Sequence, residues 1–152
     1  WAGFGVNRPD TGHRTAPSAM NSQEIDLYVA LADGLFLYDA LGHRLKAVAR
    51  EDVRSKTAGQ PFVQDAPLSL IFVADFARAP KMREDERDRY AAVDTGYISQ
   101  NIYLFCASEG LATVVHELSD RDSLAKALRL RPDQKVILAQ VVGFPKSMQS
   151  GK

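Results

Sequence analysis

The chain has 152 residues, of which 45% are hydrophobic, and this is enough for one domain with a substantial core. Nineteen basic residues balance nineteen acidic ones, so the composition carries no electrostatic footprint for nucleic acid or an anionic membrane surface. No apolar stretch approaches the ~20 residues that cross a bilayer. We expect a single domain over residues 1–152 whose partner is a small molecule or another protein.

The two ends of the sequence and its one cysteine give further expectations. Cys106 is the single cysteine, which excludes an internal disulfide and suits the cytosol and the periplasm equally. The first residue is Trp1, and no basic segment followed by an apolar one is visible, so we expect that an upstream segment has been removed. Residues 147–152 are small and polar, which is typical of a flexible tail.

The first half of the chain predicts a loop followed by strands. Residues 1–24 are rich in Gly, Pro, Asn, Ser and Thr, which is typical of a loop region. Apolar and polar residues alternate from Ile25 to Leu31 and predict a strand. Two turn signals then separate strands at 35–38 and 44–48, so we expect an antiparallel meander.

The middle of the chain predicts a short helix and a central strand. Residues 50–57 fit a short helix that ends before Gly59 and Pro61. The segment Leu68–Phe76 is almost continuously apolar, which favours a strand in the middle of the sheet with both faces covered. The charged residues that follow are interpreted as a solvated loop and the first turns of a helix.

The longest helical pattern runs from about Glu84 to Ser108. Its C-terminal half is apolar on most sides, which predicts burial in a core or in a subunit interface. Gly96 inside it costs ~1 kcal/mol relative to Ala, so we expect close packing at that point. Gly110 fits the left-handed cap of this helix. The polar residues on the helix are interpreted as packing or interface hydrogen-bonding groups, namely Asp94, Gln100 and Asn101.

The remaining residues predict a strand at 111–116, a helix at 120–130 and a last strand at 135–144. Together these elements favour an α+β sandwich with a mainly antiparallel sheet flanked by helices. No metal site is expected, because the three histidines are far apart in the sequence. No glycine-rich nucleotide motif follows a strand, and no nucleophile elbow surrounds Ser18.

Two segments with unusual composition carry a family resemblance. One is residues 14–23 (RTAPSAMNSQ), directly before a strand, and the other is residues 107–113 (ASEGLAT), directly after the long helix. With DTGYISQNIYL at 94–104, the SDRDSLAKALRL helix and the closing VVGFPK, the chain resembles the FMN-dependent nitroreductase family, in particular its thiazoline-oxidase-like branch. The resemblance implies a nitroreductase-like α/β sandwich that contains one long buried helix.

In that family the flavin lies at the interface of a homodimer, so the resemblance implies FMN, a transient NAD(P)H donor and a second copy of the chain. It implies that the loop within residues 1–24 faces the flavin, often that of the partner, through Arg14, Pro17, Ser18, Ala19 and Asn21. It also implies that the turn after the long helix directs the backbone N–H groups of Glu109 and Gly110 at the reactive edge of the flavin, with Leu111 beside them. Fixed backbone dipoles stabilise the charge of a reduced flavin. The flavin carries the chemistry, so no catalytic side chain is required.

One family feature is missing before Trp1. Family members usually begin with a helix whose Arg-Arg-Ser-x-Arg motif holds the FMN phosphate, and after the last strand only Lys146 is a local replacement. A single lysine is a point charge and replaces a bidentate arginine poorly. His116 is interpreted either as a substrate-pocket residue or as a surface histidine. The segment at Pro17–Asn21 also fits a plain loop, and Gly110 a plain helix cap.

Two functions follow from the resemblance and from the missing motif. The first is an oxidoreductase that transfers hydride from NAD(P)H through FMN to a nitroaromatic, quinone or similar acceptor. The alternative is a non-catalytic dimeric binding domain or fragment, without flavin because the phosphate-binding motif is absent.

Overall fold

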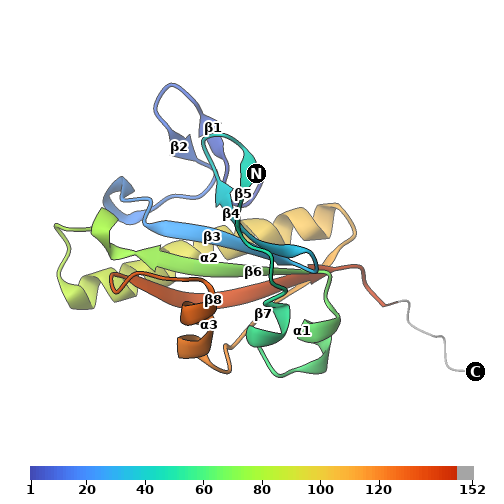
Figure 1. The fold of residues 1–152 in the computed structure, drawn as a ribbon. Coiled ribbons are helices and arrows are strands. Elements are labelled where there is room, and N and C mark those ends of the chain that lie inside the picture. Colours follow the sequence, from blue (N-terminus) through green and yellow to red (C-terminus); the bar gives the residue numbers. More distant parts are fainter. Residues whose placement is uncertain (147–152) are drawn as a thin grey trace, which may run out of the picture.

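The fold is built on one antiparallel sheet, seen in a computed structural model that describes residues 1–146 (Figure 1). The expected tail at 147–152 lies outside the described residues. The sheet has six strands in the order β5-β4-β3-β6-β8-β7. Their bounds are β3 Ile25–Leu31, β4 Gly34–Asp39, β5 Arg44–Ala49, β6 Leu68–Asp75, β7 Ala112–His116 and β8 Gln134–Gly143.

The middle of the sheet is formed by β3 and β6, which pair with Ile25 opposite Ala74. Every residue of β6 from Ser69 to Asp75 is buried, because helices or loops cover both faces of this strand. The alternation of β3 places Leu27 and Val29 on one face and Tyr28 and Ala30 on the other. The central position predicted for the apolar segment 68–76 is confirmed.

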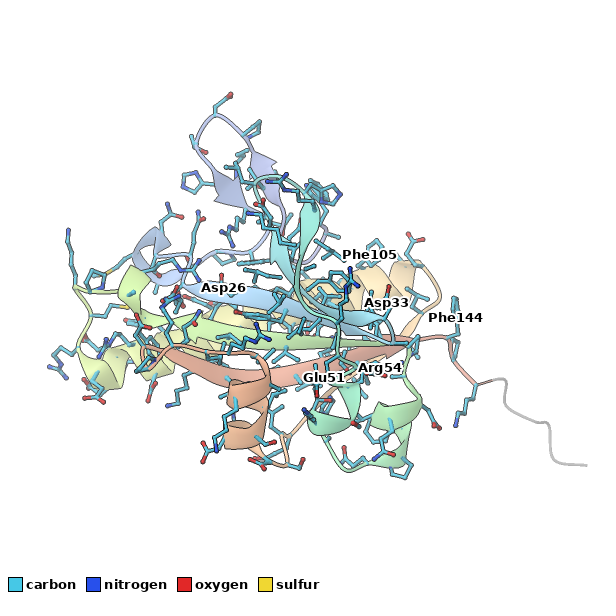
Figure 2. The ribbon with its side chains drawn as sticks, in the orientation of Figure 1. Asp26, Asp33, Glu51, Arg54, Phe105 and Phe144 are labelled. Carbon is cyan, nitrogen blue, oxygen red and sulfur yellow. The ribbon has the colours of Figure 1, made fainter. Side chains whose placement is uncertain are left out.

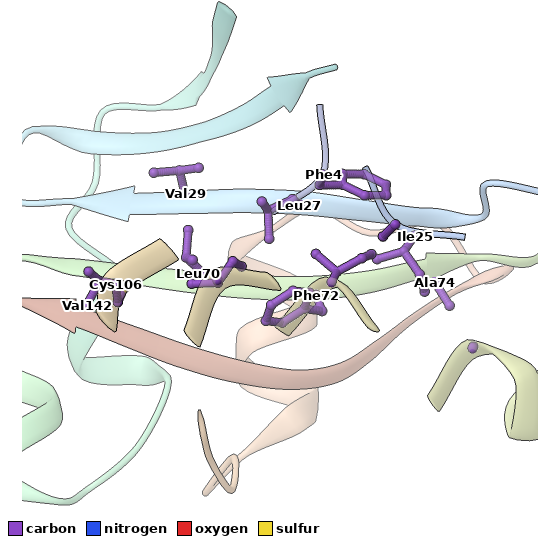
Figure 3. Close-up of a cluster of buried hydrophobic side chains, with 13 residues drawn as sticks. Phe4, Ile25, Leu27, Val29, Leu70, Phe72, Ala74, Cys106 and Val142 are labelled. Carbon is purple, nitrogen blue, oxygen red and sulfur yellow. The ribbon is translucent and has the colours of Figure 1, made fainter. Parts of the chain in front are cut away.

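Helices cover the two faces of the sheet unequally. The long helix α2 (Glu84–Ser108) covers one face and packs on apolar side chains of β3, β6 and β8. Figure 3 shows this cluster, with Leu27 on β3, Phe72 on β6 and Val142 on β8. The short helices α1 (Pro61–Asp65) and α3 (Arg121–Ala127) cover the other face (Figure 1). The expected α+β sandwich with one long helix is confirmed.

Local chemistry fixes both ends of α2. Acidic residues fill its first turn, where they complement the positive end of the helix dipole, and the Glu86 carboxylate accepts a hydrogen bond from the Arg83 N–H. At the other end Gly110 has φ = 67°, and the Leu111 N–H donates to the Cys106 carbonyl at 2.8 Å. This is the six-to-one hydrogen bond of a Schellman cap. The cap predicted at Gly110 is therefore present.

Residues 1–24 are more ordered than their composition predicted. They contain a small hairpin of β1 (Val6–Arg8) and β2 (His13–Arg14), followed by a 3-10 turn, η1, at Ala19–Asn21. Phe4 and Ala16 are buried on each side of the hairpin and anchor it to the core. Gly12 supports the turn with φ = 70°, which favours glycine. Tertiary anchoring, not local propensity, orders this segment.

The helix expected at 50–57 was wrong. Only the 3-10 turn η2, at Arg54–Lys56, forms there, and α1 begins at Pro61, a residue that fits the first turn because it needs no N–H acceptor. A third 3-10 turn, η3, follows β6 at Phe76–Arg78. Close packing at Gly96 is also absent within the chain, because a Cβ there would meet nothing within 4 Å. None of the helices among residues 1–146 is long and apolar enough to span a bilayer.

Candidate functional site

The loop at residues 17–23 is held in an unusual backbone conformation. Met20, Asn21 and Gln23 have φ values of 53°, 53° and 49°, which L-residues adopt at a cost of ~1–3 kcal/mol each unless their surroundings enforce it. The Ser18 hydroxyl accepts a hydrogen bond from the Gln23 N–H at 2.9 Å and so closes the loop on itself. Pro17 and Asn21 are exposed at its surface.

The same loop is tied to α2 through a buried carboxyl group. The Ala19 N–H donates to Asp94 Oδ2 at 2.8 Å, and Asp94 is only 3% exposed. Burial is the main cause that raises the pKa of Asp94 to about 6, the Ala19 amide opposes the rise, and the neighbouring Glu24 adds to it. Asp94 therefore serves as a hydrogen-bonding group between elements, as the sequence indicated. Asn101 does the same, because its Nδ2 donates to the carbonyls of Gly3 and Thr15.

Arg14 lies at the base of this loop with an unsatisfied donor. Its guanidinium sits 4.2 Å from the centre of the Phe4 ring, and its Nε is buried without an acceptor. Burial lowers the pKa of Arg14, and the charge of Arg78 acts in the same direction. The environment of Arg14 would therefore be improved by an added negative or hydrogen-bond-accepting group.

The turn after α2 offers one free backbone donor. The Glu109 N–H donates to the Phe105 carbonyl, and the Leu111 N–H is used in the helix cap. Among residues 1–146 no acceptor takes the N–H of Gly110, which is exposed. Of the three residues expected to face a flavin at this turn, only Gly110 therefore has an amide available.

The two groups of site residues lie far apart along α2, one near its middle and one just after its end. The loop is fixed at Asp94, and the turn follows Ser108, 14 positions later, which is about 21 Å along a helix. Lys146 belongs to the turn's end of the sheet, because Gly143 pairs with Ala112 there. Lys146 is exposed, with its Nζ 3.5 Å from an Asp65 carboxylate oxygen. A single copy of the chain does not bring the predicted flavin-facing residues together.

Comparison with known proteins identifies the family. Residues 1–144 match the profile described as "Nitroreductase family". The chain belongs to the nitroreductase family. A protein of Methanocaldococcus jannaschii whose name places it among the nitroreductases is 31% identical over 124 residues, which are 75% of this chain and 62% of that protein. The match thus spans less than two thirds of that relative.

Solved structures agree with this assignment. A Ralstonia eutropha protein, also named among the nitroreductases, superposes with a TM-score of 0.91 at 43% identity, over 97% of this chain and 70% of its own. The E. coli microcin synthetase McbBCD complex, with truncated pro-MccB17 bound, superposes with a TM-score of 0.83 at 21% identity, over 96% of this chain and 61% of the matched chain. At that identity the second likeness supports the nitroreductase fold alone.

His116 is buried, although one of its two interpretations placed it on the surface. It is only 6% exposed and pairs with Ala139, on the sheet face that α3 covers. Its Nδ1 lies 3.2 Å from the Glu117 carbonyl, and its Nε2 is buried without a partner. The surface interpretation was wrong, because the pleat of β7 turns this ring inward, away from the face that carries α2.

One face of α2 is exposed and apolar in this nitroreductase chain. Val93, Tyr97 and Leu104 are 44%, 48% and 60% exposed, and Gly96 and Gln100 lie among them. The helical spacing of these five residues places them on one side of the helix, which we call the α2 outer face. Phe105, 45% exposed, projects beside it (Figure 2). Within the described chain nothing covers this face.

An apolar cavity of about 610 Å³ adjoins the turn after α2. Residues from the chain start, the β4–β5 hairpin and α2 line it, including Phe4, Tyr38, His43 and Leu111. The Tyr38 hydroxyl and His43 Nδ1 are 3.1 Å apart at its wall. Its size lies within the range of small-molecule sites. The sequence analysis missed Tyr38 and His43, since neither belongs to a motif and only the hairpin brings them here.

The described residues offer no candidate metal centre beside this cavity. Among residues 1–146, no three His, Cys, Asp or Glu side chains gather as metal ligands would. Cys106, the one cysteine, is buried, and burial raises the pKa of its thiol.

Proposed function

We propose that the chain forms a homodimer that binds FMN and transfers hydride from NAD(P)H to a nitroaromatic, quinone or similar acceptor. One observation carries the proposal. The two groups of residues predicted to face a flavin lie at opposite ends of the α2 outer face, which is largely apolar and is not covered by any described residue. A second copy is the simplest way to cover the face and to join the two groups.

The symmetry of such a dimer supports this arrangement. When two identical helices pair about a twofold axis perpendicular to them, they run antiparallel, and the same surface serves both copies. The α2 outer face is centred near Gln100, so an axis there places position 94 of one copy roughly opposite position 106 of the other. The loop anchored at Asp94 then approaches the Gly110 turn of the second copy. Exposed Gly96 would let the two helices approach closely.

The residues on this chain fit a flavin in several respects. Gly110 has a free N–H to donate to the flavin, Leu111 provides an apolar contact, and Arg14 has a buried donor without an acceptor. Pro17, Ser18, Ala19 and Asn21 would contribute from the loop of the other copy. Bound FMN supplies hydride and electron transfer. The protein orients the ring, excludes water and stabilises negative charge with fixed dipoles.

Of the features expected of an FMN site, the groups that bind the phosphate are the least well represented on this chain. Lys146 lies at the same end of the sheet as the Gly110 turn, and its Nζ is already 3.5 Å from an Asp65 carboxylate oxygen. We therefore expect residues 1–152 to bind FMN weakly and to discriminate little between FMN and riboflavin. Adding a helix with the family's Arg-Arg-Ser-x-Arg motif ahead of Trp1 should raise FMN affinity by about 100-fold, and riboflavin affinity much less, since charge-assisted hydrogen bonds to phosphate contribute ~1.5–3 kcal/mol each.

The dimer can be tested with one matched pair of variants. Leu104→Glu places a charge on the α2 outer face, whereas Leu41→Glu places one at the exposed turn between β4 and β5. We expect sedimentation at micromolar concentration to give dimers for the unchanged chain and for Leu41→Glu, and monomers for Leu104→Glu. A monomeric unchanged chain would contradict the dimer.

Shared sites can be tested by mixing two defective chains. Pro17→Asp damages the loop half of each site and Gly110→Asp the turn half, each by placing a carboxylate beside a reduced flavin. Mixed dimers contain one intact site and one doubly damaged site, so equal mixing should restore about a quarter of the flavin sites. Flavin fluorescence measures the recovery. No recovery would refute the shared site, and no FMN binding by any form would favour the non-catalytic alternative.

A further inference from the structure

The apolar cavity beside the turn after α2 has walls that specific contacts hold in place. A Cβ on Gly3 would lie only 2.6 Å from Cγ1 of Ile102, so a glycine lets the start of the chain lie against α2. Asn101 on α2 donates from its Nδ2 to the carbonyls of Gly3 at 3.4 Å and Thr15 at 3.3 Å. Close-packed interiors leave few voids larger than a water molecule, so about 610 Å³ far exceeds a packing defect.

The side chains around the cavity favour an uncharged aromatic occupant. Aromatic rings pack well against the edges and faces of other rings. The lining contains four Trp, Phe or Tyr side chains, namely Trp1, Phe4, Tyr38 and Phe105. The described lining includes no acidic residue, and its one charged side chain, Arg44, already donates from Nε to Asp39 Oδ2 at 3.1 Å. A charged ligand would therefore lose hydration without gaining a free partner of opposite charge.

Tyr38 and His43 place one free hydrogen-bond donor at the cavity wall. The Tyr38 hydroxyl oxygen and His43 Nδ1 are 3.1 Å apart, and no other hydrogen bond of either side chain is present within residues 1–146. A neutral tyrosine has one O–H and a neutral histidine one N–H, and their mutual hydrogen bond uses one of these donors. If the tyrosine donates, the N–H at His43 Nε2 stays free, and if the histidine donates, the tyrosine O–H stays free. Either arrangement leaves one donor on a residue that lines the cavity.

We propose that this cavity binds an uncharged aromatic carbonyl compound, whose oxygen accepts a hydrogen bond from the Tyr38–His43 pair. The apolar walls, which include Leu70 and Val142, bury the ring system. A carbonyl oxygen accepts and does not donate, so it satisfies the one free donor and brings no proton that lacks an acceptor. Tyr38 and His43 thus determine specificity, because they separate a carbonyl compound from a hydrocarbon of the same shape.

The cavity and the proposed dimer face lie on different sides of α2. Ile102 and Cys106 line the cavity and are only 8% and 1% exposed, on the side of the helix that packs on the sheet. Leu104 belongs to the exposed α2 outer face. Leu111 lines the cavity from the turn, so under the proposed function the ligand would contact a residue beside the flavin. Only the role of this ligand as electron acceptor rests on that proposed function.

Two compounds with the same ring skeleton test the site in the flavin-free chain. 1-Tetralone carries one carbonyl group, and tetralin is the same bicyclic compound without it. Equilibrium dialysis gives the ratio of the tetralin dissociation constant to that of 1-tetralone. In Tyr38→Phe/His43→Leu, which has no donor left on these two residues, the ratio should fall about fivefold, because one net hydrogen bond is lost. Each single variant keeps a donor, so its ratio should stay within about twofold of that of the unchanged chain.

A second pair of variants shows where the compounds bind. Leu45 lines the cavity and is 46% exposed, so Leu45→Asp should fold and should weaken both compounds about tenfold by placing a carboxylate at the rim. Leu41→Asp, in the same β4–β5 hairpin but outside the lining, should leave both affinities unchanged. Trp1 is the only tryptophan and lines the cavity, so both compounds should alter its fluorescence.

The outcomes separate this inference from the proposed function. Leu104→Glu should bind both compounds as the unchanged chain does, because the α2 outer face is not part of the cavity. Binding of 1-tetralone by a chain that neither dimerises nor binds FMN would support the cavity and count against the proposed function. No binding by the unchanged chain, or an unaltered ratio in the double variant, would overturn the inference.

Discussion

At the scale of single residues, Gly110 depends on its backbone angle and not on space. Its φ of 67° is left-handed, yet a Cβ there would meet nothing within 4 Å. Replacement by Ala should therefore cost only the left-handed strain, ~1–2 kcal/mol. In a chain of this length that lowers the melting temperature by about 2–8 °C, because ~1 kcal/mol corresponds to about 2–4 °C.

Gly59 provides the control for Gly110→Ala, since its Cβ position is also open and its φ is not left-handed. Gly59→Ala should leave the melting temperature unchanged or slightly higher. Gly110→Asn should lie between the two, because Asn tolerates the left-handed region. Equal melting temperatures for the two alanine variants would mean that the cap of α2 does not need this backbone angle.

At the scale of elements, β7 is an edge strand that α2 holds in place. The Val115 N–H, which points away from β8, donates to the Tyr103 hydroxyl on α2 at 2.8 Å. Edge strands leave such groups open to pairing with other chains, and here a helix side chain occupies one of them. The contact links the exit of α2 to the strand that follows the Gly110 turn.

Removing that hydroxyl with Tyr103→Phe should destabilise the protein by ~1–3 kcal/mol, because the Val115 N–H is left without an acceptor. Hydrogen exchange at Val115 should become faster. Tyr90→Phe, also on α2, is the matched control, because no hydrogen bond of the Tyr90 hydroxyl is present among residues 1–146. If both variants unfold at the same temperature, the contact contributes nothing measurable.

Several elements could be predicted from local patterns, and others depend on distant contacts. The alternation at Ile25–Leu31 and the apolar run at 68–76 identified two central strands, because each pattern reflects burial of one or both faces. The hairpin before Arg14 was missed, since Phe4 and Ala16 order it by entering the core. The inward turn of His116 was equally hidden, because five residues of β7 do not reveal which face is covered.

The candidate site was predictable in part. The motifs predicted that the 17–21 loop and the Gly110 turn face a flavin, which stays a prediction, but they did not reveal that the loop is anchored near the middle of α2 while the turn follows its end. Asp94 was interpreted as a packing group, and its contact with Ala19 confirms that. Its contact with the Ala19 amide had no signal in the sequence, because the two residues are 75 positions apart and only the fold joins them.

At the scale of the whole molecule, the α2 outer face makes stability depend on concentration if the proposed dimer forms. A partner that binds only the folded chain stabilises it by mass action. The melting temperature of the unchanged chain should therefore rise as protein concentration increases from 1 to 100 times the dimer dissociation constant, because the free energy of unfolding increases by about 2.3 kcal/mol over that range. Leu104→Glu should melt at one temperature throughout. A concentration-independent melting temperature in the unchanged chain would contradict the dimer.

The strand order also sets a sequence of events during folding. The meander of β3, β4 and β5 pairs neighbours in the chain, and such hairpins form in about 1–10 μs. The central pairs must wait, because Ile25 meets Ala74 and Leu68 meets Val142 only after long loops close. Until β8 arrives, one edge of β6, the most apolar strand, stays unpaired. We therefore expect that β8 closes this edge late, and that a chain cut short before Gln134 would expose the edge and aggregate more readily.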